Sequence, residues 1–243
     1  FANKSGVIQK PFQSSHTNAR DASAGSSVNT TSTSIFANVY RVGPARGGGL
    51  SYQVDRIFFY FDTSTITSTP ASATFSVQRT TSAPSGKFQL IKSTAFGGDG
   101  QTALATGDFD AFPGFTAGVT DSMSNEVTDY CDSTIDASAW GTSNDYNDTA
   151  INLNSTALSD MASNDFLILA ILDSAYDYKD QDGGPSAGNK LAHYTAAFTG
   201  TTRDPKIDYV AAGYGNDVIG VASADIGEIN AVATADIAEL NGL

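Results

Sequence analysis

Four aspartates gather in one short segment of the chain and offer its plainest metal-binding chemistry. Gly183-Gly184 follows them, so the segment is expected to form a loop. Carboxylate oxygens at short spacing on a loop are ligands that suit Ca²⁺. The spacing departs from the EF-hand pattern, because Tyr178 and Asn189 stand where that pattern needs acidic residues. The alternative is a solvated loop whose aspartates form turns. The candidate calcium ligands are Asp173, Asp177, Asp180 and Asp182.

The residues that could act as acids, bases or nucleophiles form no recognisable catalytic set. Serine catalysis needs a base, and the chain has two histidines, His16 and His193. Cys131 is the sole cysteine, which excludes an intrachain disulfide and predicts a buried or half-buried thiol. A glycosidase needs two carboxylates held at a set separation, and no such pair stands out. The sequence therefore indicates a protein without enzymatic activity.

Aromatic side chains in or beside predicted loops offer a second kind of site. Sugar rings stack on aromatic faces, and the loop ends of a β-sandwich can present such faces. The alternative is that these rings anchor the loops on the core. The candidate glycan contacts are Trp140, Tyr146, Tyr176 and Tyr178.

The C-terminal segment repeats itself with a period of 11 residues. Residues 218–228 are followed by a second copy at 229–239, and a third copy begins at Leu240. Units of fixed period bury their apolar faces against copies of themselves or against partner chains. The repeat therefore predicts an assembly element. The residues expected to mediate assembly are Val221, Ile226, Ile229, Val232, Ile237 and Leu240.

Two backbone structures fit this period. An 11-residue repeat corresponds to about 3.67 residues per helical turn, which favours a right-handed helical supercoil. The alternative is a ladder of short β-bridges, at Val221-Ala222 and Val232-Ala233, alternating with single helical turns capped by Ser223 and Thr234. Glycine and asparagine within the repeat favour the ladder. Either form is too short to be stable alone, so partners must complete it, most simply in a trimer.

The remainder of the chain predicts many short strands and little helix. Residues 52–62 and 166–172 carry apolar side chains on both faces, which is typical of central strands covered on two sides. Residues 155–161 are the one predicted helix, with Asn154 or Ser155 as its N-cap. This pattern indicates an all-β fold, a jelly-roll-like β-sandwich body with a short C-terminal repeat segment. Further strands are expected at 35–42, 73–77, 88–92, 151–153, 190–198 and 206–210.

Composition divides the chain into four parts. Residues 1–34 are polar and rich in Ser, Thr, Asn and Ala, and are expected to form an extended N-terminal arm. Residues 35–210 would form the β-sandwich domain. Residues 211–217 would be a linker, and residues 218–243 the repeat segment that mediates assembly or anchoring.

The charge balance narrows the range of partners. The net charge is −13 and the isoelectric point about 4.2. Binding of nucleic acid needs clustered Lys and Arg to neutralise phosphates, so this charge argues against a nucleic-acid partner and against an anionic membrane surface. No run of about 18 apolar residues predicts a membrane span. Only 16% of the residues are charged, and Ser, Thr, Asn, Gly and Ala are abundant instead, which predicts a polar surface with few charges. Surfaces of this kind occur on many extracellular and virion proteins.

Several segments, in order along the chain, carry a resemblance to a known family. Residues 56–64, with the sequence RIFFYFDTS, are the strongest of them, and weaker matches lie at 19–22, 146–148, 194–196 and 200–206. Together they resemble the DNRLRE-type β-sandwich proteins of cell surfaces and bacteriophage particles, over roughly residues 18–210. The tail is similar to repeats at the ends of phage structural proteins. The resemblance implies a virion β-sandwich domain, a structural role for Arg56, and no particular activity.

These observations predict a non-enzymatic structural protein of a virus particle, located on the virion and therefore extracellular. It could be a capsid decoration protein, a head fibre or a tail component. Its expected partners are further copies of itself, other virion proteins and glycans. The alternative is a carbohydrate-binding or adhesion module on a cell surface or extracellular filament. No cofactor is implied apart from the candidate calcium ion.

Overall fold

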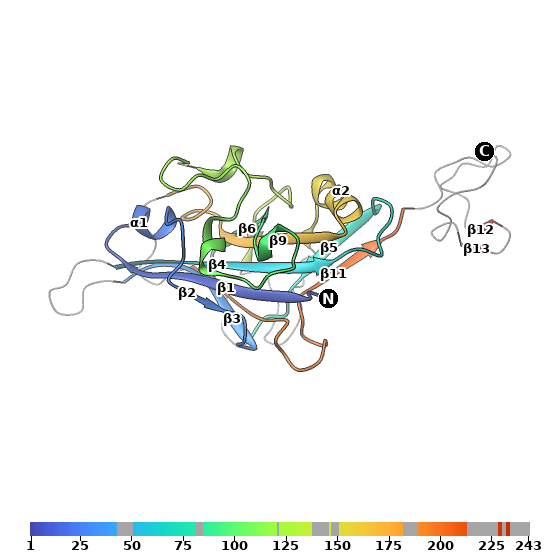
Figure 1. Cartoon of the computed structure of the whole chain (residues 1–243), viewed down its shortest axis with the longest axis horizontal. Coiled ribbons are helices and arrows are strands. Elements are labelled where there is room, and N and C mark those ends of the chain that lie inside the picture. Colours follow the sequence, from blue (N-terminus) through green and yellow to red (C-terminus); the bar gives the residue numbers. More distant parts are fainter. Residues whose placement is uncertain are drawn as a thin grey trace.

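The protein is built almost entirely from antiparallel β-strands, as a computed structural model shows (Figure 1). The structure describes residues 1–42, 51–80, 85–120, 122–137, 146, 151–181 and 189–212, together with the backbone of 228–229 and 232–233. The predicted all-β sandwich class is confirmed.

The larger sheet is centred on β4, whose sequence carries apolar side chains on both faces. Antiparallel β1 flanks β4 along one edge, and β9 pairs with its second half along the other edge. β3 pairs with β10 along its residues 34–39 and then with the first half of β4 along its residues 39–42. The strands of this sheet are β1 (Lys4–Gln13), β2 (Ser27–Asn29), β3 (Ser34–Val42), β4 (Ser51–Asp62), β6 (Lys87–Lys92), β7 (Ile135–Asp136), β9 (Phe166–Asp173) and β10 (Asn189–Tyr194).

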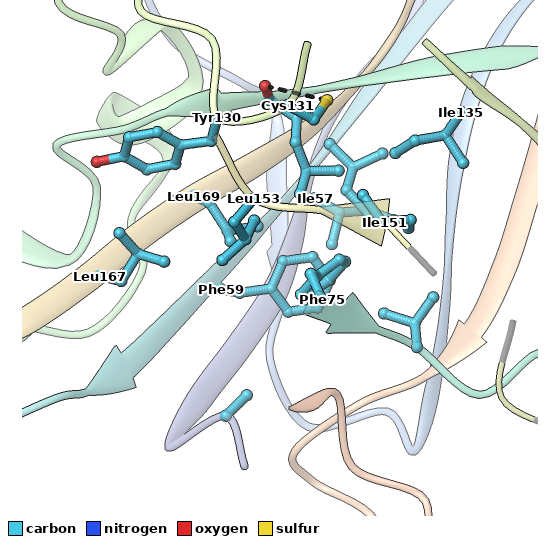
Figure 2. Close-up of a cluster of buried hydrophobic side chains, with 14 of the residues drawn as sticks. Ile57, Phe59, Phe75, Tyr130, Cys131, Ile135, Ile151, Leu153, Leu167 and Leu169 are labelled. Carbon is cyan, nitrogen blue, oxygen red and sulfur yellow. Dashed lines mark hydrogen bonds between the residues drawn. The ribbon is translucent and has the colours of Figure 1, made fainter. Parts of the chain in front are cut away.

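A second, smaller sheet covers one face of the first. It is formed by β5 (Ser72–Ser76), with β8 (Ile151–Asn152) on one side and β11 (Lys206–Val210) on the other. The ring of Phe75 on β5 packs against Phe59 on β4, at 5.3 Å between ring centroids (Figure 2). The ring of Phe61, also on β4, lies 6.1 Å from that of Phe75. Burial of each large apolar side chain contributes about 1.5–3 kcal/mol, so these aromatic rings hold the two layers together.

Loops and 3-10 helices cover the opposite face of β4. Phe58 on that face stacks on Phe112, at 5.7 Å between ring centroids, within a separate apolar cluster. The predicted coverage of this strand on two sides is therefore confirmed, and β9 is likewise buried from Leu167 to Asp173. The covering helices are Phe96–Gly98, Thr106–Asp110 and Met123–Asn125.

The two α-helices among the described residues are short and lie at opposite ends of the body (Figure 1). The predicted helix is α2 (Ser155–Ser163), whose N-cap Asn154 accepts the backbone N–H of Ala157 at 3.1 Å. The second helix, α1 (His16–Arg20), has Ser15 as its N-cap. Among the described residues, no helix is long and apolar enough to cross a bilayer.

The structure corrects two boundaries predicted from the sequence. Residues 1–34 are not a separate arm, because β1 pairs with β4 from Lys4 to Gln13 and buries both Val7 and Ile8. A strand buried on both faces lacks the alternation of apolar and polar residues that marks a half-exposed strand. The polar residues around Val7 and Ile8 therefore made this segment look like an arm. The strand expected at 190–198 ends at Tyr194, where the chain turns. Of the predicted linker 211–217, only residues 211 and 212 lie among the described residues.

Candidate functional site

A buried ion pair forms the centre of a polar network beneath α1. Arg56 on β4 donates from Nε and Nη2 to the two carboxylate oxygens of Asp177, at 2.9 and 2.7 Å. Its Nη1 donates to the carbonyl oxygen of Phe109 at 2.7 Å, and Nη2 also donates to that of Arg20 at 2.9 Å. Both ionised side chains are fully buried. A buried charge of this kind requires such complete pairing, so Arg56 organises the fold here.

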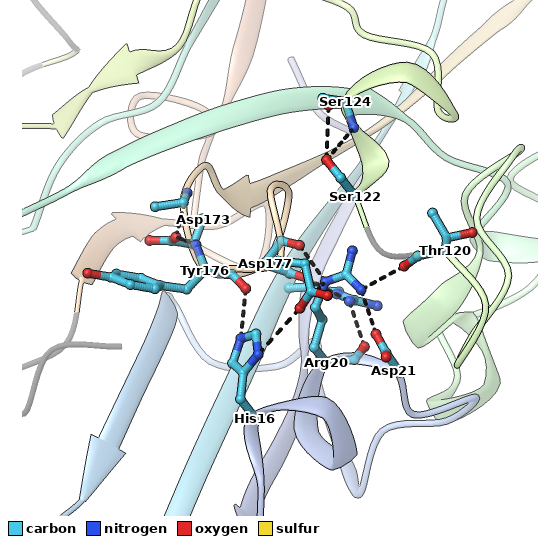
Figure 3. A network of polar contacts seen from close by, with 12 residues as sticks. His16, Arg20, Asp21, Thr120, Ser122, Ser124, Asp173, Tyr176 and Asp177 are labelled. Carbon is cyan, nitrogen blue, oxygen red and sulfur yellow. Dashed lines mark hydrogen bonds and ion pairs between the residues drawn. The ribbon is translucent and has the colours of Figure 1, made fainter. Parts of the chain in front are cut away.

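Arg20 of α1 extends the network to Asp21 and Thr120 (Figure 3). Its Nε donates to the carbonyl oxygen of Asp177 at 2.7 Å, and Nη1 donates to Asp21 at 2.6 Å and to the Thr120 carbonyl at 2.9 Å. His16, one turn earlier, donates from Nε2 to the Tyr176 carbonyl at 2.7 Å. These contacts fasten α1 to the loop after β9.

The three candidate calcium ligands that the structure describes contact protein donors. One oxygen of Asp173 accepts the backbone N–H groups of Ala175 and Tyr176, and the other accepts from Asn189. Asp177 is paired with Arg56, and Asp180 lies 3.4 Å from Nδ1 of His16. No group of three potential ligands is gathered among the described residues, which leave out Asp182. The described aspartates therefore act as loop and ion-pair residues in this structure.

The aromatic candidates that the structure describes, Tyr146, Tyr176 and Tyr178, are buried or half-buried. Tyr178 is buried, and its hydroxyl donates to both carboxylate oxygens of Asp129, at 2.9 and 2.7 Å. Burial beside this carboxylate raises the pKa of Tyr178. Tyr146 is half-buried and donates to the Asp204 carbonyl at 3.0 Å. Tyr176 is also half-buried, and Trp140 lies outside the described residues. Tyr146 and Tyr178 thus anchor loops, which was the alternative to glycan contact.

A further buried carboxylate, Asp55 on β4, was not anticipated. The side chains of Gln53, Asn38 and Gln9 donate to it, with the closest contacts at 2.7 and 2.8 Å from Gln53. Burial raises the pKa of Asp55 to about 6, against the opposing effect of these donors. The donors come from three strands, so only the register of the sheet brings them together. A single carboxylate held by amides is a structural arrangement rather than an acid–base pair.

His193, a candidate base, and Cys131, a candidate nucleophile, are both enclosed. His193 on β10 is fully buried against Phe59, and its Nδ1 donates to the Tyr194 carbonyl at 2.5 Å. Burial lowers the pKa of His193 to about 4. Cys131 is buried, as predicted, and burial raises its pKa to about 11. A thiol with a raised pKa is a poor nucleophile at neutral pH.

Four residues of the repeat are described by their backbone. β12 (Glu228–Ile229) pairs antiparallel with β13 (Val232–Ala233), and Ile229 stands opposite Val232. β13 coincides with one of the β-bridges of the predicted ladder. The other assembly candidates, Val221, Ile226, Ile237 and Leu240, lie outside the described residues.

A surface groove beside α1 was missed by the sequence analysis. It has a volume of about 530 Å³ and runs beside the end of β1, where the register shifts between Lys10 and Gln13. Phe12 lies within this irregularity and is 80% exposed. Pro11 was the available signal, because a proline inside a strand marks an edge or a bulge. The groove is lined by Lys10, Gln13, Thr17, Asn18, Asp21, Ala22, Ser23, Ala24 and Gly118.

Comparison with known proteins does not assign the chain to a family. No protein-family model matches the chain, and a search of curated proteins finds no match.

Proposed function

We propose that the protein is a non-enzymatic structural component of a virus particle, such as a capsid decoration protein, a head fibre or a tail component, and that it assembles through its C-terminal repeat. The observation that carries this proposal is the junction between the two complete copies of the repeat. There β12 ends one copy and begins the next, and pairs with β13.

The size of this hairpin argues for partners. Each strand has two residues. An isolated two-stranded hairpin is marginally stable at best in water, even when its strands are longer. Repeated units gain stability by stacking on equivalent units, and three chains around one axis would supply them. A homotrimer is therefore the favoured assembly, with docking on another virion protein as the alternative arrangement.

The body supports a structural role. Its ionisable residues with the most unusual surroundings, Arg56, Asp177, Asp55 and His193, all contact protein groups within the fold. The sandwich encloses its own core between two sheets, so the body does not depend on the repeat for its core. Two features support the location on a virus particle. The composition is acidic with few charged residues, and residues 56–64 resemble virion β-sandwich proteins.

Solution mass tests the assembly. Light scattering of the full chain is expected to give a trimer, and the double variant Ile229→Asp/Val232→Asp is expected to give a monomer, because charges at this strand pair would oppose its packing on a partner. Val119→Asp is the matched control, since Val119 is 73% exposed in the body. A full-length monomer, or a double variant with unchanged mass, would contradict assembly through the repeat.

The second candidate function is carbohydrate binding or adhesion. The specific observation that favours it is the exposed Phe12, whose chain neighbour Gln13 lines the polar groove at α1. A glycan array on which the purified protein binds nothing would count against this candidate.

A further inference from the structure

Phe12 combines two unfavourable features, which together point to a function outside the fold. The side chain is 80% exposed, so its ring contributes little to the core. Its backbone has a φ of 57°, in the left-handed region that bulky residues rarely occupy. Strain of this kind persists where the surrounding structure enforces it, and it concentrates at binding sites. Here the shift of register after Lys10 enforces it.

The chain on either side of Phe12 lines the groove with polar groups that are already held in place. Nζ of Lys10 donates to the carbonyl oxygen of Ala24 at 3.1 Å. Nε2 of Gln13 donates to the carbonyl oxygen of Pro11 at 2.7 Å. Asp21 accepts from the buried Arg20 at 2.6 Å. Groups fixed by such contacts lose little conformational freedom when a ligand binds.

The charges of the groove select the class of ligand. Lys10 and Asp21 are its charged residues and balance each other. The chain as a whole carries −13, which repels anions such as phosphates and acidic polymers. Thr17, Asn18 and Gln13 offer both donors and acceptors. Phe12, which precedes the lining residue Gln13 in the chain, offers an exposed apolar ring. A ligand with hydroxyl groups around a ring and no net charge matches all three properties.

We propose that this groove binds an uncharged oligosaccharide. Phe12 stacks on a sugar ring, while Gln13, Asn18 and Asp21 form hydrogen bonds with sugar hydroxyl groups. The site gives the carbohydrate-binding candidate a location, and it depends on no property of the C-terminal repeat.

The test uses the full chain on an array of neutral oligosaccharides, followed by calorimetric titration with the best binder. Phe12→Ala is expected to weaken binding by about tenfold or more, since an aromatic contact contributes about 1.4 kcal/mol. Phe12→Trp is expected to retain binding because it keeps the aromatic face. Phe36→Ala, a change to another partly exposed phenylalanine on β3, is the matched control and is expected to bind normally.

Phe12→Asn separates a binding role from a structural one. Asparagine tolerates the left-handed conformation, so this variant is expected to keep or raise the Tm while losing the ligand. A lower Tm with unchanged affinity would assign Phe12 to the fold and overturn the proposal. Absence of any neutral glycan ligand would overturn it too, as would a Phe12 variant whose solution mass falls, which would make Phe12 a contact between copies. A failure of the repeat to form trimers leaves these outcomes unaffected.

Discussion

Arg56 and Asp177 lie 121 positions apart in the sequence and form a bidentate ion pair in which both side chains are fully buried. The same guanidinium group donates to the carbonyl oxygens of Phe109 and Arg20. One side chain of β4 therefore fixes α1, the 3-10 helix Thr106–Asp110 and the loop after β9. These segments cover the second apolar cluster, so the pair and the cluster depend on each other.

Removal of one member of this pair should destabilise the protein strongly. Asp177→Asn leaves the Arg56 charge buried without its counter-charge, and the free energy of unfolding is expected to fall by about 3–5 kcal/mol. Urea denaturation measures it. The control is Asp208→Asn, which breaks the surface pair with Lys206 and is expected to cost less than about 1 kcal/mol. Equal small losses in both variants would mean that the buried pair contributes little.

Asp55 should make the protein less stable as the pH rises. Its pKa is raised from 3.8 to about 6, so the folded state keeps a proton that the unfolded state releases. The contribution favours folding at low pH and is lost between about pH 4 and pH 6. Asp55→Asn is expected to remove this loss, which amounts to roughly 3 kcal/mol. Urea denaturation at pH 4 and at pH 7 measures it, and an unaltered pH dependence in the variant would contradict the prediction.

His193 should act in the opposite direction over nearly the same range. Its pKa is lowered from 6.5 to about 4, so the unfolded state binds a proton that the folded state excludes. Its contribution is present above about pH 6.5 and is lost as the pH falls to about 4. His193→Phe keeps a ring against Phe59 and is expected to remove this acid-induced loss, again roughly 3 kcal/mol. The same urea measurements apply, and a variant that retains the loss would exclude His193 as its source.

Calcium should leave the stability unchanged. The oxygens of Asp173 already accept two backbone N–H groups and the amide of Asn189, and those of Asp177 are bound to Arg56. A cation would have to displace these donors. The Tm is therefore expected to be equal in millimolar Ca²⁺ and in EDTA, as thermal unfolding can measure. A Tm that rises with Ca²⁺ concentration, and not with Mg²⁺, would restore the calcium hypothesis.

The strands that could be predicted are those whose burial is visible in the apolar character of their own residues. The apolar runs of β4 and β9 follow from coverage on both faces, and Asn154 caps α2 as its side chain allows. β1 was not predicted because its sequence mixes Val7 and Ile8 with polar residues, and its pairing with β4 cannot be read from that local pattern. The burial of Asp55 was not predicted either. Gln9 and Asn38 donate hydrogen bonds to it only because the register of the neighbouring strands brings them together.

The all-β class, the central strands, the acidic character and the repeat can be predicted from the residues alone, because they depend on residue type and on local period. Which polar residues meet follows from the folded arrangement of the chain. It placed Asp177 on Arg56 and Tyr178 on Asp129, which gave predicted site residues a role inside the fold. It also exposed Phe12 on a strained backbone beside a polar groove. Contacts between distant segments depend on chain topology and strand register, and no local pattern of residues encodes either.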